Sequence, residues 1–438
     1  MTCEVAVANK LAIALAADSA VTFSGAGSQN TYASGANKIF QLAHSQPVAV
    51  MIYNNASLGS VPWELILKSY RTNLSVKGFP RLGGYCDDLV SFINSCSEDL
   101  IPDSLKESGT LFVYGAAVMR VISGITSRFP QLLHTDVDSE QARGYWSTAI
   151  DEMESWLDSE PVCDSLDAAE LESELRVRSL SLSADVADFL LKSSEYSSLA
   201  AFVDNRRLAN VGIKTAFKKG FEVLPDSYTG LVVAGFGVDD YMPGFVDLKF
   251  FGFIGSRVLF RRDTTQSVNH NGTASIIEAF ARRAMVETFT QGASPQVWTA
   301  VGNAFETYAA KVCQTAAEAA GLTIAPEHLE KGITAHSQEF TNDWTRTVFA
   351  DHLRPLWTVV ASLSISELAE LAETLVLLES LKEKVTQRTQ SVGGPIDVAV
   401  ITKAEGLVWI KRKLYFEPHL NHRYFRRVET EEGHHHAR

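Results

Sequence analysis

The feature that most limits the fold of this chain is the presence of strand-forming runs at both of its ends. Two apolar runs near the N-terminus, at 3–8 and 11–17, are separated by the polar pair Asn9-Lys10, which is typical of a β-hairpin. A second pair of runs lies near the other end, at 396–401 and 407–410. Strands so distant in sequence must meet in shared sheets, and helices must cover the outer faces of those sheets.

The interior of the chain alternates between strand-like and helical periodicity. Further strands are expected at 47–53, 231–236 and 246–260, and helices at 55–73, 82–100, 140–157, 184–219, 273–288, 295–320, 336–363 and 366–384. The last of these helices follows a capping box, Ser364 to Glu367. Residues 105–228 are rich in helical patterns and poor in strands, so we expect a helical insertion there.

Composition and charge exclude several classes of protein. The 438-residue chain has a net charge of -13, and this argues against general binding to nucleic acid or to an anionic membrane, because both are polyanions. Its five cysteines are widely spaced and form no CxxC pair, which predicts neither a disulfide framework nor a zinc site. No signal peptide or long apolar span is apparent, and the sequence therefore favours a reducing, cytoplasmic location.

Residues able to carry chemistry are concentrated in the first forty positions. If Met1 is removed, Thr2 becomes a residue with a nucleophilic hydroxyl and a free α-amine, and an amine with a pKa of roughly 7.7 to 8 is matched to accepting the hydroxyl proton. Lys38 would lower the pKa of that amine and stabilise negative charge, and Asp18 would hold the lysine. Each residue also has a plainer reading, with Asp18 capping a turn and Lys38 on the surface.

Several segments together resemble a known family. They are Thr2, the run Leu15-Ala16-Ala17-Asp18-Ser19, the run Asn37-Lys38-Ile39-Phe40, a buried strand ending in Asn54-Asn55-Ala56, the helix start Gly272-Thr273-Ala274-Ser275, and the segment Ser391 to Thr402. They resemble the β-type proteasome subunits and their bacterial relatives, which are N-terminal-nucleophile hydrolases. The resemblance implies an α+β fold, a four-layer α-β-β-α sandwich of two antiparallel sheets. Residues 1–104 and 229–427 would be its two halves, the second with extra helices, and 105–228 would be the helical insertion and 428–438 a disordered tail.

The same resemblance assigns site residues. It makes Thr2 the nucleophile and general base, Lys38 its cationic partner and Asp18 the orienting carboxylate. The family stabilises the oxyanion with the backbone N–H of a glycine, and this chain has Asn54 or Asn55 at that place. Supporting positions fall at Asn271, where the family has a serine, and at Ser391, beside Thr389 and Val392 where the family has an acid and a serine. The substrate pocket would include Val21, Phe40, Ile52 and Ala56, which favours a hydrophobic residue before the cleaved bond.

The resemblance predicts hydrolysis of a peptide or amide bond through an acyl ester on Thr2, without a cofactor. A peptide or protein would be the substrate and a homo-oligomeric ring or partial ring the assembly, with an ATPase partner left open. Two alternatives remain. One is a catalytically inactive structural or regulatory subunit with the same fold, and the other is an amidase that acts on a small molecule. No GxSxG, HExxH or P-loop motif occurs that would point to another hydrolase class.

Overall fold

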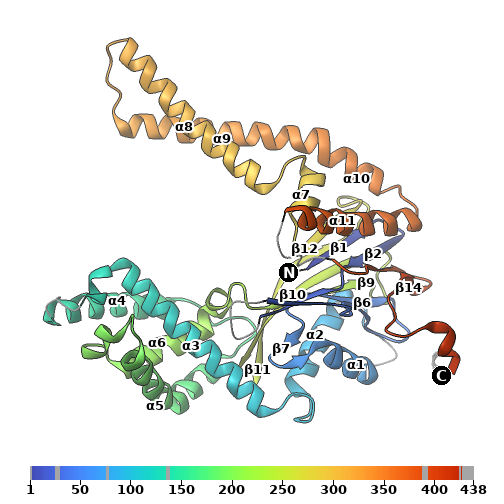
Figure 1. The fold of residues 1–438 in the computed structure, drawn as a ribbon, viewed down its shortest axis with the longest axis horizontal. Coiled ribbons are helices and arrows are strands. Elements are labelled where there is room, and N and C mark those ends of the chain that lie inside the picture. Colours follow the sequence, from blue (N-terminus) through green and yellow to red (C-terminus); the bar gives the residue numbers. More distant parts are fainter. Residues whose placement is uncertain are drawn as a thin grey trace.

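The structure is a computed structural model that describes residues 2–24, 30–74, 78–134, 139–386, 393–423 and 426; at 21–24, 30–34 and 139 it describes the backbone alone. Within these ranges the chain forms two five-stranded antiparallel sheets surrounded by helices (Figure 1). The fold is therefore of the mixed α+β class, with both ends of the chain in one sheet.

The first sheet joins the two ends of the chain. Its strand order is β12-β1-β2-β13-β14, with β1 at Cys3–Ala8, β2 at Ala12–Ala17, β12 at Ile276–Ala281, β13 at Asp397–Thr402 and β14 at Gly406–Lys411. The N-terminal hairpin predicted from the sequence is confirmed, because Glu4 pairs with Ala17 across β1 and β2. The same Ala17 pairs with Asp397 of β13, so the closing hairpin lies against the opening one.

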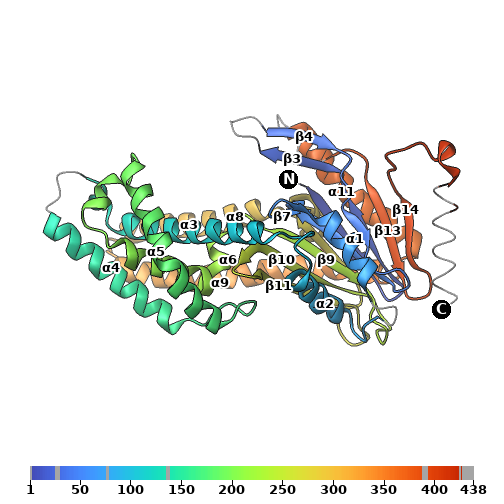
Figure 2. The same ribbon diagram turned by 90° about the horizontal axis from the view of Figure 1, so that it is seen from below.

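The second sheet is formed by the interior strands. Its order is β11-β10-β9-β6-β5, with β5 at Ile39–Gln41, β6 at Val48–Asn54, β9 at Thr229–Gly235, β10 at Gly244–Ile254 and β11 at Arg257–Ser267. Two short hairpins stand apart from it, β3 and β4 at Ala20–Ser24 and Asn30–Ser34 (Figure 2), and β7 and β8 at Ser57–Leu58 and Val61–Pro62. β6 is buried along all but its last residue, as its unbroken apolar run predicts.

The two sheets pack face to face between helices. Alternate residues of β1 and β2, such as Ala6 and Leu15, meet Met51 and Val232 of the other sheet in one core. The opposite face of the first sheet is covered by α11, Ile365–Thr386, and that of the second by α1, Trp63–Asn73, and α2, Leu82–Ser95. The order of layers is thus helix, sheet, sheet, helix (Figures 1 and 2).

A helical unit follows α2 in the chain. It comprises α3 at Asp103–Arg128, α4 at Ser139–Ser159, α5 at Ala168–Lys192 and α6 at Asn205–Val223, with short 3-10 turns at Pro130–Leu133 and Ser197–Ala201. These helices share one apolar core, which also includes Phe251 and Leu259 of the second sheet. α3 is long and apolar enough to cross a membrane, but half of its most apolar window is buried, as in a core helix.

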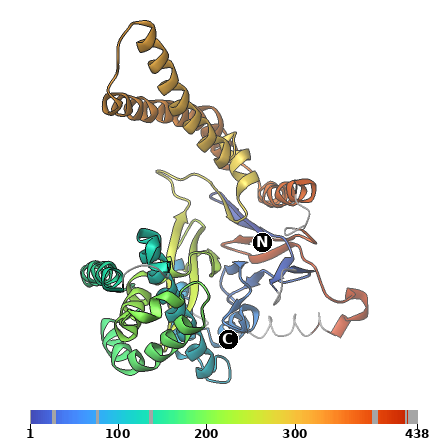
Figure 3. The ribbon, with the colours of Figure 1, turned by 60° about the vertical axis from the view of Figure 1, so that its left-hand side comes forward.

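A second group of helices separates β12 from α11. α7, Ala284–Gln291, leads into α8, Pro295–Ala319, and α9, Pro326–Val348, which form a long hairpin that we call the arm. The arm projects away from the sandwich (Figures 1 and 3) and returns through a π-helical turn, Phe349–Leu353, and α10, Arg354–Val360. Stacked rings join its two helices, Trp298 with Trp344 and Phe305 with Phe340.

Several predicted elements differ in the structure. The strand expected at 246–260 is a hairpin of β10 and β11, and the helix expected at 82–100 ends at Ser95. The helix expected at 273–288 is instead strand β12 followed by α7, because Ile276–Ala281 pairs with β1 and its helical spacing is overridden by the sheet. The helix expected at 55–73 begins only at Trp63, after the β7–β8 hairpin. The segment expected to be helical over 184–219 is interrupted between α5 and α6, where Asp204 caps the second helix.

Candidate active site

The alternation of β1 sends its first residues to two different layers. Cys3, Val5 and Val7 face α11, whereas Ala6 and Ala8 face the opposing sheet. Thr2 and Glu4 alternate with Cys3 and Val5 and therefore point to the same face of the sheet as Ala6, toward the opposing sheet. The Thr2 hydroxyl donates a hydrogen bond to the Glu4 carboxylate, as this placement requires. Cys3 is therefore on the opposite face of the sheet from Thr2, and burial raises the pKa of its thiol well above the ordinary value.

Asp18, the residue after β2, makes hydrogen bonds to three other segments of the chain. Its Oδ1 accepts a hydrogen bond from the Cys3 backbone N–H at 3.2 Å, and its Oδ2 accepts one from the Gly393 N–H at 2.8 Å. Lys38 Nζ donates to the same Oδ1 at 2.5 Å. The carboxylate is fully buried. Asp18 therefore holds the N-terminal strand, the closing hairpin and the lysine in one place.

Lys38 lies just before β5 and is held between two carboxylates. Its Nζ is 2.5 Å from Asp18 Oδ1 and 3.1 Å from Glu4 Oε1, and the side chain is almost entirely buried. Burial acts to lower the pKa of Lys38, but the negative charges of Glu4 and Asp18 outweigh that effect and raise it. Lys38 therefore stays a cation inside the sandwich.

Glu4 is the site residue that the sequence analysis missed. Its Oε2 accepts a hydrogen bond from Thr2 Oγ1 at 3.1 Å, and the residue is 0% exposed. Burial is the largest influence on its pKa and raises it to about 7, although Lys38 acts in the opposite direction. A signal was present, because a charged residue two places after Thr2 in an otherwise apolar strand must face the same side as Thr2.

The residue proposed for the oxyanion has an unusual backbone. Asn54 ends β6 with a φ of 66°, a left-handed conformation that glycine adopts freely and that asparagine tolerates better than most residues. Its side-chain amide donates to the carbonyl of Tyr228 at 2.8 Å, which fixes this turn. Asn55 follows as an exposed residue. Asn54 thus adopts the left-handed backbone conformation that is otherwise typical of glycine.

One of the two predicted supporting residues, Asn271, falls within the described residues. Asn271 lies just before β12, whose Ile276 pairs with Ala8, at the end of β1 away from Thr2. That position contradicts a supporting role for Asn271, and the error follows from the missed strand. At the other end of β12, the Arg282 N–H donates to the Thr2 carbonyl at 3.0 Å. Ser391, like Thr389 and Val392, lies outside the described residues.

The proposed pocket residues lie in different surroundings. Phe40 and Ile52 are nearly buried and contribute to the core beneath α1 and α2, and Ala56 is exposed. Val21 belongs to β3, where the structure describes the backbone alone. Phe40 and Ile52 thus contribute mainly to core packing, as buried apolar residues usually do.

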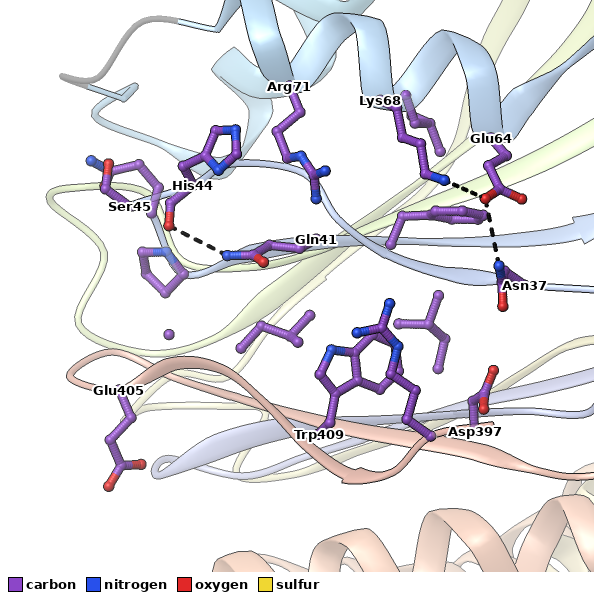
Figure 4. Close-up of a pocket in the computed structure, with 18 of the residues that line it drawn as sticks. Asn37, Gln41, His44, Ser45, Glu64, Lys68, Arg71, Asp397, Glu405 and Trp409 are labelled. Atoms are coloured by element: carbon purple, nitrogen blue, oxygen red, sulfur yellow. Dashed lines mark hydrogen bonds and ion pairs between the residues drawn. The ribbon is translucent and has the colours of Figure 1, made fainter. Parts of the chain in front are cut away.

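A groove of about 760 Å³ runs between β5, α1 and the β13–β14 hairpin. Its walls carry aromatic and charged groups, among them Phe40, Arg71, Asp397, Trp409 and Arg412 (Figure 4). Asn37, the neighbour of Lys38, lines one end and reaches Glu64, which also pairs with Lys68. Thr2, Glu4 and Asp18 are not among the residues that line the groove.

Metal chemistry has no candidate site among the described residues, since no three His, Cys, Asp or Glu side chains there gather in an arrangement that would hold an ion. What the described residues do offer is a hydroxyl, two carboxylates and an ammonium that are buried and linked by hydrogen bonds and an ion pair. Such a chain can activate a hydroxyl by accepting its proton and can stabilise the charges that result.

Comparisons with known proteins add little beyond this geometry. No family model matches the chain, and no curated protein does. Among solved structures it is similar to an Anbu (Gly-1) mutant from Hyphomicrobium sp. strain MC1, with 11% sequence identity and a TM-score of 0.28 over 98% of this chain and 93% of that chain. A TM-score this low does not establish a shared fold.

Proposed function

We propose that this protein is a threonine-type N-terminal-nucleophile hydrolase that cleaves a peptide or amide bond. The observation that carries the proposal is the buried chain of contacts at the N-terminus. The Thr2 hydroxyl bonds to Glu4, Glu4 pairs with Lys38, and Lys38 bonds to Asp18. The resemblance of the N-terminal segments to β-type proteasome subunits and the four-layer arrangement support the same assignment.

The proposed reaction proceeds through an acyl ester. After removal of Met1, Thr2 Oγ1 attacks the carbonyl carbon, its proton passes to a base, and the amine product leaves with a proton returned to it. Water then hydrolyses the ester. Lys38 stabilises the negative charge that develops nearby, and the backbone N–H groups at Asn54 and Asn55 are proposed as donors to the oxyanion.

Substitution of Thr2 tests this function. Thr2→Ala removes the nucleophile and should lower hydrolysis of fluorogenic peptides and small amides to background, whereas Thr2→Ser should keep measurable turnover. Thr215→Ala is a matched control, because Thr215 is a buried threonine of α6 that bonds to its own helix. Intact-mass analysis establishes whether Met1 is absent from each preparation. Equal turnover in Thr2→Ala and the wild type would refute the assignment.

One observation favours the alternative of a catalytically inactive subunit. Thr2 is only 4% exposed in the chain that carries Met1, which leaves its hydroxyl little access to a substrate. A protein that keeps Met1 and shows no turnover of either substrate class would support this alternative. Turnover of small amides but not of peptides would instead favour the amidase.

A further inference from the structure

The residue that the proposed reaction leaves without a role is Glu4. It is fully buried, yet it carries a carboxylate in direct contact with the proposed nucleophile. A carboxylate placed there for structure alone is costly, because burying a charge is unfavourable unless the group is paired and hydrogen-bonded. Its two oxygens are divided between two tasks, with Oε1 facing Lys38 and Oε2 facing the Thr2 hydroxyl.

We propose that Glu4 is the general base that accepts the Thr2 hydroxyl proton, so that Thr2 can be activated without a free α-amine. This inference rests on the proposed function and assigns its first proton transfer to a side chain. The hydrogen bond from Oγ1 to Oε2 is 3.1 Å long, which is within the reach required of a general base.

The other carboxylate of the site is not available for this task. Asp18 Oδ1 already accepts from the Cys3 N–H and from Lys38, and Oδ2 accepts from the Gly393 N–H. Among the described residues, the hydrogen bond that Glu4 Oε2 accepts comes from Thr2. Asp18 is therefore a positioning residue for Lys38, while Glu4 faces the reacting hydroxyl.

The steps balance without a further reagent. The proton of Thr2 Oγ1 moves to Glu4 Oε2 as the bond from Oγ1 to the substrate carbon forms. The bond from that carbon to nitrogen then breaks, and the amine product takes the proton from Glu4. In the second half, water gives a proton to Glu4 and attacks the ester, and the released Thr2 oxygen regains a proton from Glu4. The products are an amine and a carboxylic acid.

The electrostatic surroundings of Glu4 suit the role of a general base. The groups that act on Glu4 are Lys38, Asp18 and Thr2, and the net result with burial is a pKa of about 7. A general base is most effective when its pKa is near the working pH. Because the base is active when ionised, activity that depends on Glu4 should rise as the pH increases through about 7.

The test compares kcat/KM for a fluorogenic peptide between pH 5 and 9 in matched variants. Glu4→Gln keeps the shape of the side chain but cannot accept a proton, and it should lower kcat/KM by roughly 10²- to 10⁴-fold and abolish the rise near pH 7. Glu4→Asp should keep a rise with pH at reduced rate. Glu379→Gln is the control, because Glu379 is a buried carboxylate of α11 that bonds to the Met285 N–H and should behave as the wild type.

A chain with one phenylalanine inserted between Met1 and Thr2 separates the two bases. A bulky second residue keeps Met1 in place, so Thr2 has no free amine, and we expect turnover that Glu4→Gln abolishes. The inference is overturned if Glu4→Gln retains the wild-type rate and pH profile, or if the inserted chain is folded and inactive while the wild type is active. If the proposed function itself were wrong, the outcome would differ, because Thr2→Ala would then turn over the substrate at the wild-type rate. Thermal unfolding of each variant excludes loss of fold as the cause.

Discussion

Two of the buried carboxylate sites in the sandwich differ in their partners. At the N-terminal end, Glu4 and Asp18 surround the ammonium of Lys38. At the second site, the hydroxyl of Tyr53 on β6 lies 2.9 Å from each carboxylate oxygen of Asp247 on β10 and donates its single proton to that carboxylate. Both sites are nearly closed to solvent. The first balances charge with charge, and the second relies on a neutral donor.

The different partners of the two sites lead to different protonation states of their side chains. Burial is the main reason that the pKa of Asp247 rises to about 6, and the Tyr53 hydroxyl only partly offsets it. Burial and the neighbouring Asp247 also raise the pKa of Tyr53, which therefore stays a neutral donor. The N-terminal site keeps a cation next to Glu4, the carboxylate that accepts the hydrogen bond of the Thr2 hydroxyl, and this arrangement is suited to proton transfer. The Tyr53 site lacks a nucleophile and joins two strands of one sheet.

The largest effect is expected when the cation is removed from the first site. Lys38→Met leaves Glu4 and Asp18 buried without their partner, and breaking such a pair costs about 3–5 kcal/mol. We expect the free energy of unfolding, measured in urea at pH 8, to fall by that amount. The loss should be smaller at pH 5.5, where Glu4, with its pKa of about 7, is protonated.

Lys214→Met is the control for this substitution. Lys214 bonds to Asp158 at 2.8 Å, but Asp158 is largely exposed, and such surface pairs contribute at most about 1 kcal/mol. Equal losses in the two variants would mean that the Lys38 cluster is no more important to stability than a surface pair.

The second prediction concerns pH dependence at the Tyr53 site. A carboxyl whose pKa is raised in the folded state stabilises the fold when protonated, so this contribution is present below the ordinary value of 3.8 and is lost as the pH rises through about 6. The shift corresponds to about 3 kcal/mol. Asp247→Asn should remove this part of the slope in urea unfolding between pH 4 and 7. A slope identical to that of the wild type would show that Asp247 is not protonated as described.

A smaller effect is expected from Tyr53→Phe. This change removes one hydroxyl and leaves the buried Asp247 carboxylate without that donor, which costs about 1–3 kcal/mol at pH 7.5. The loss should shrink at pH 4, where the carboxyl is neutral. Tyr145→Phe is a matched control, because the hydroxyl of Tyr145 meets Gln141 at an exposed position. A loss that does not depend on pH would indicate that packing of the ring, rather than the hydrogen bond, is responsible.

The sequence predicted the layers of this fold better than the contacts of the site. The hairpin of β1 and β2 and the capping box of α11 were predictable, because both depend on residues close together in the chain, and Ser364 and Glu367 do bond reciprocally. Strand β12 was not predictable, because its pairing with β1 links residues that are between 268 and 278 positions apart in the sequence. Local helical spacing was the stronger signal there, and the sheet overrode it.

The site shows the same division. Alternation along β1 separates Thr2 from Cys3, and this could be read from the sequence. Asp18 and Gly393 are far apart in the sequence, and no spacing in the sequence predicts the hydrogen bond between them. Glu4 is the fourth polar residue of the site and lies in an otherwise apolar strand. The direction of its side chain was predictable, but its bonds to both Thr2 and Lys38 required the folded structure.

The most direct test of the central claim, that the Thr2 hydroxyl is the nucleophile, is peptide mapping by mass spectrometry after incubation with a peptide that carries an electrophilic vinyl sulfone. The account predicts a single covalent adduct on the N-terminal peptide, located at Thr2, that forms more slowly in Glu4→Gln and is absent from Thr2→Ala. An adduct that persists in Thr2→Ala, or a folded wild-type protein with Met1 removed that forms none, would contradict it.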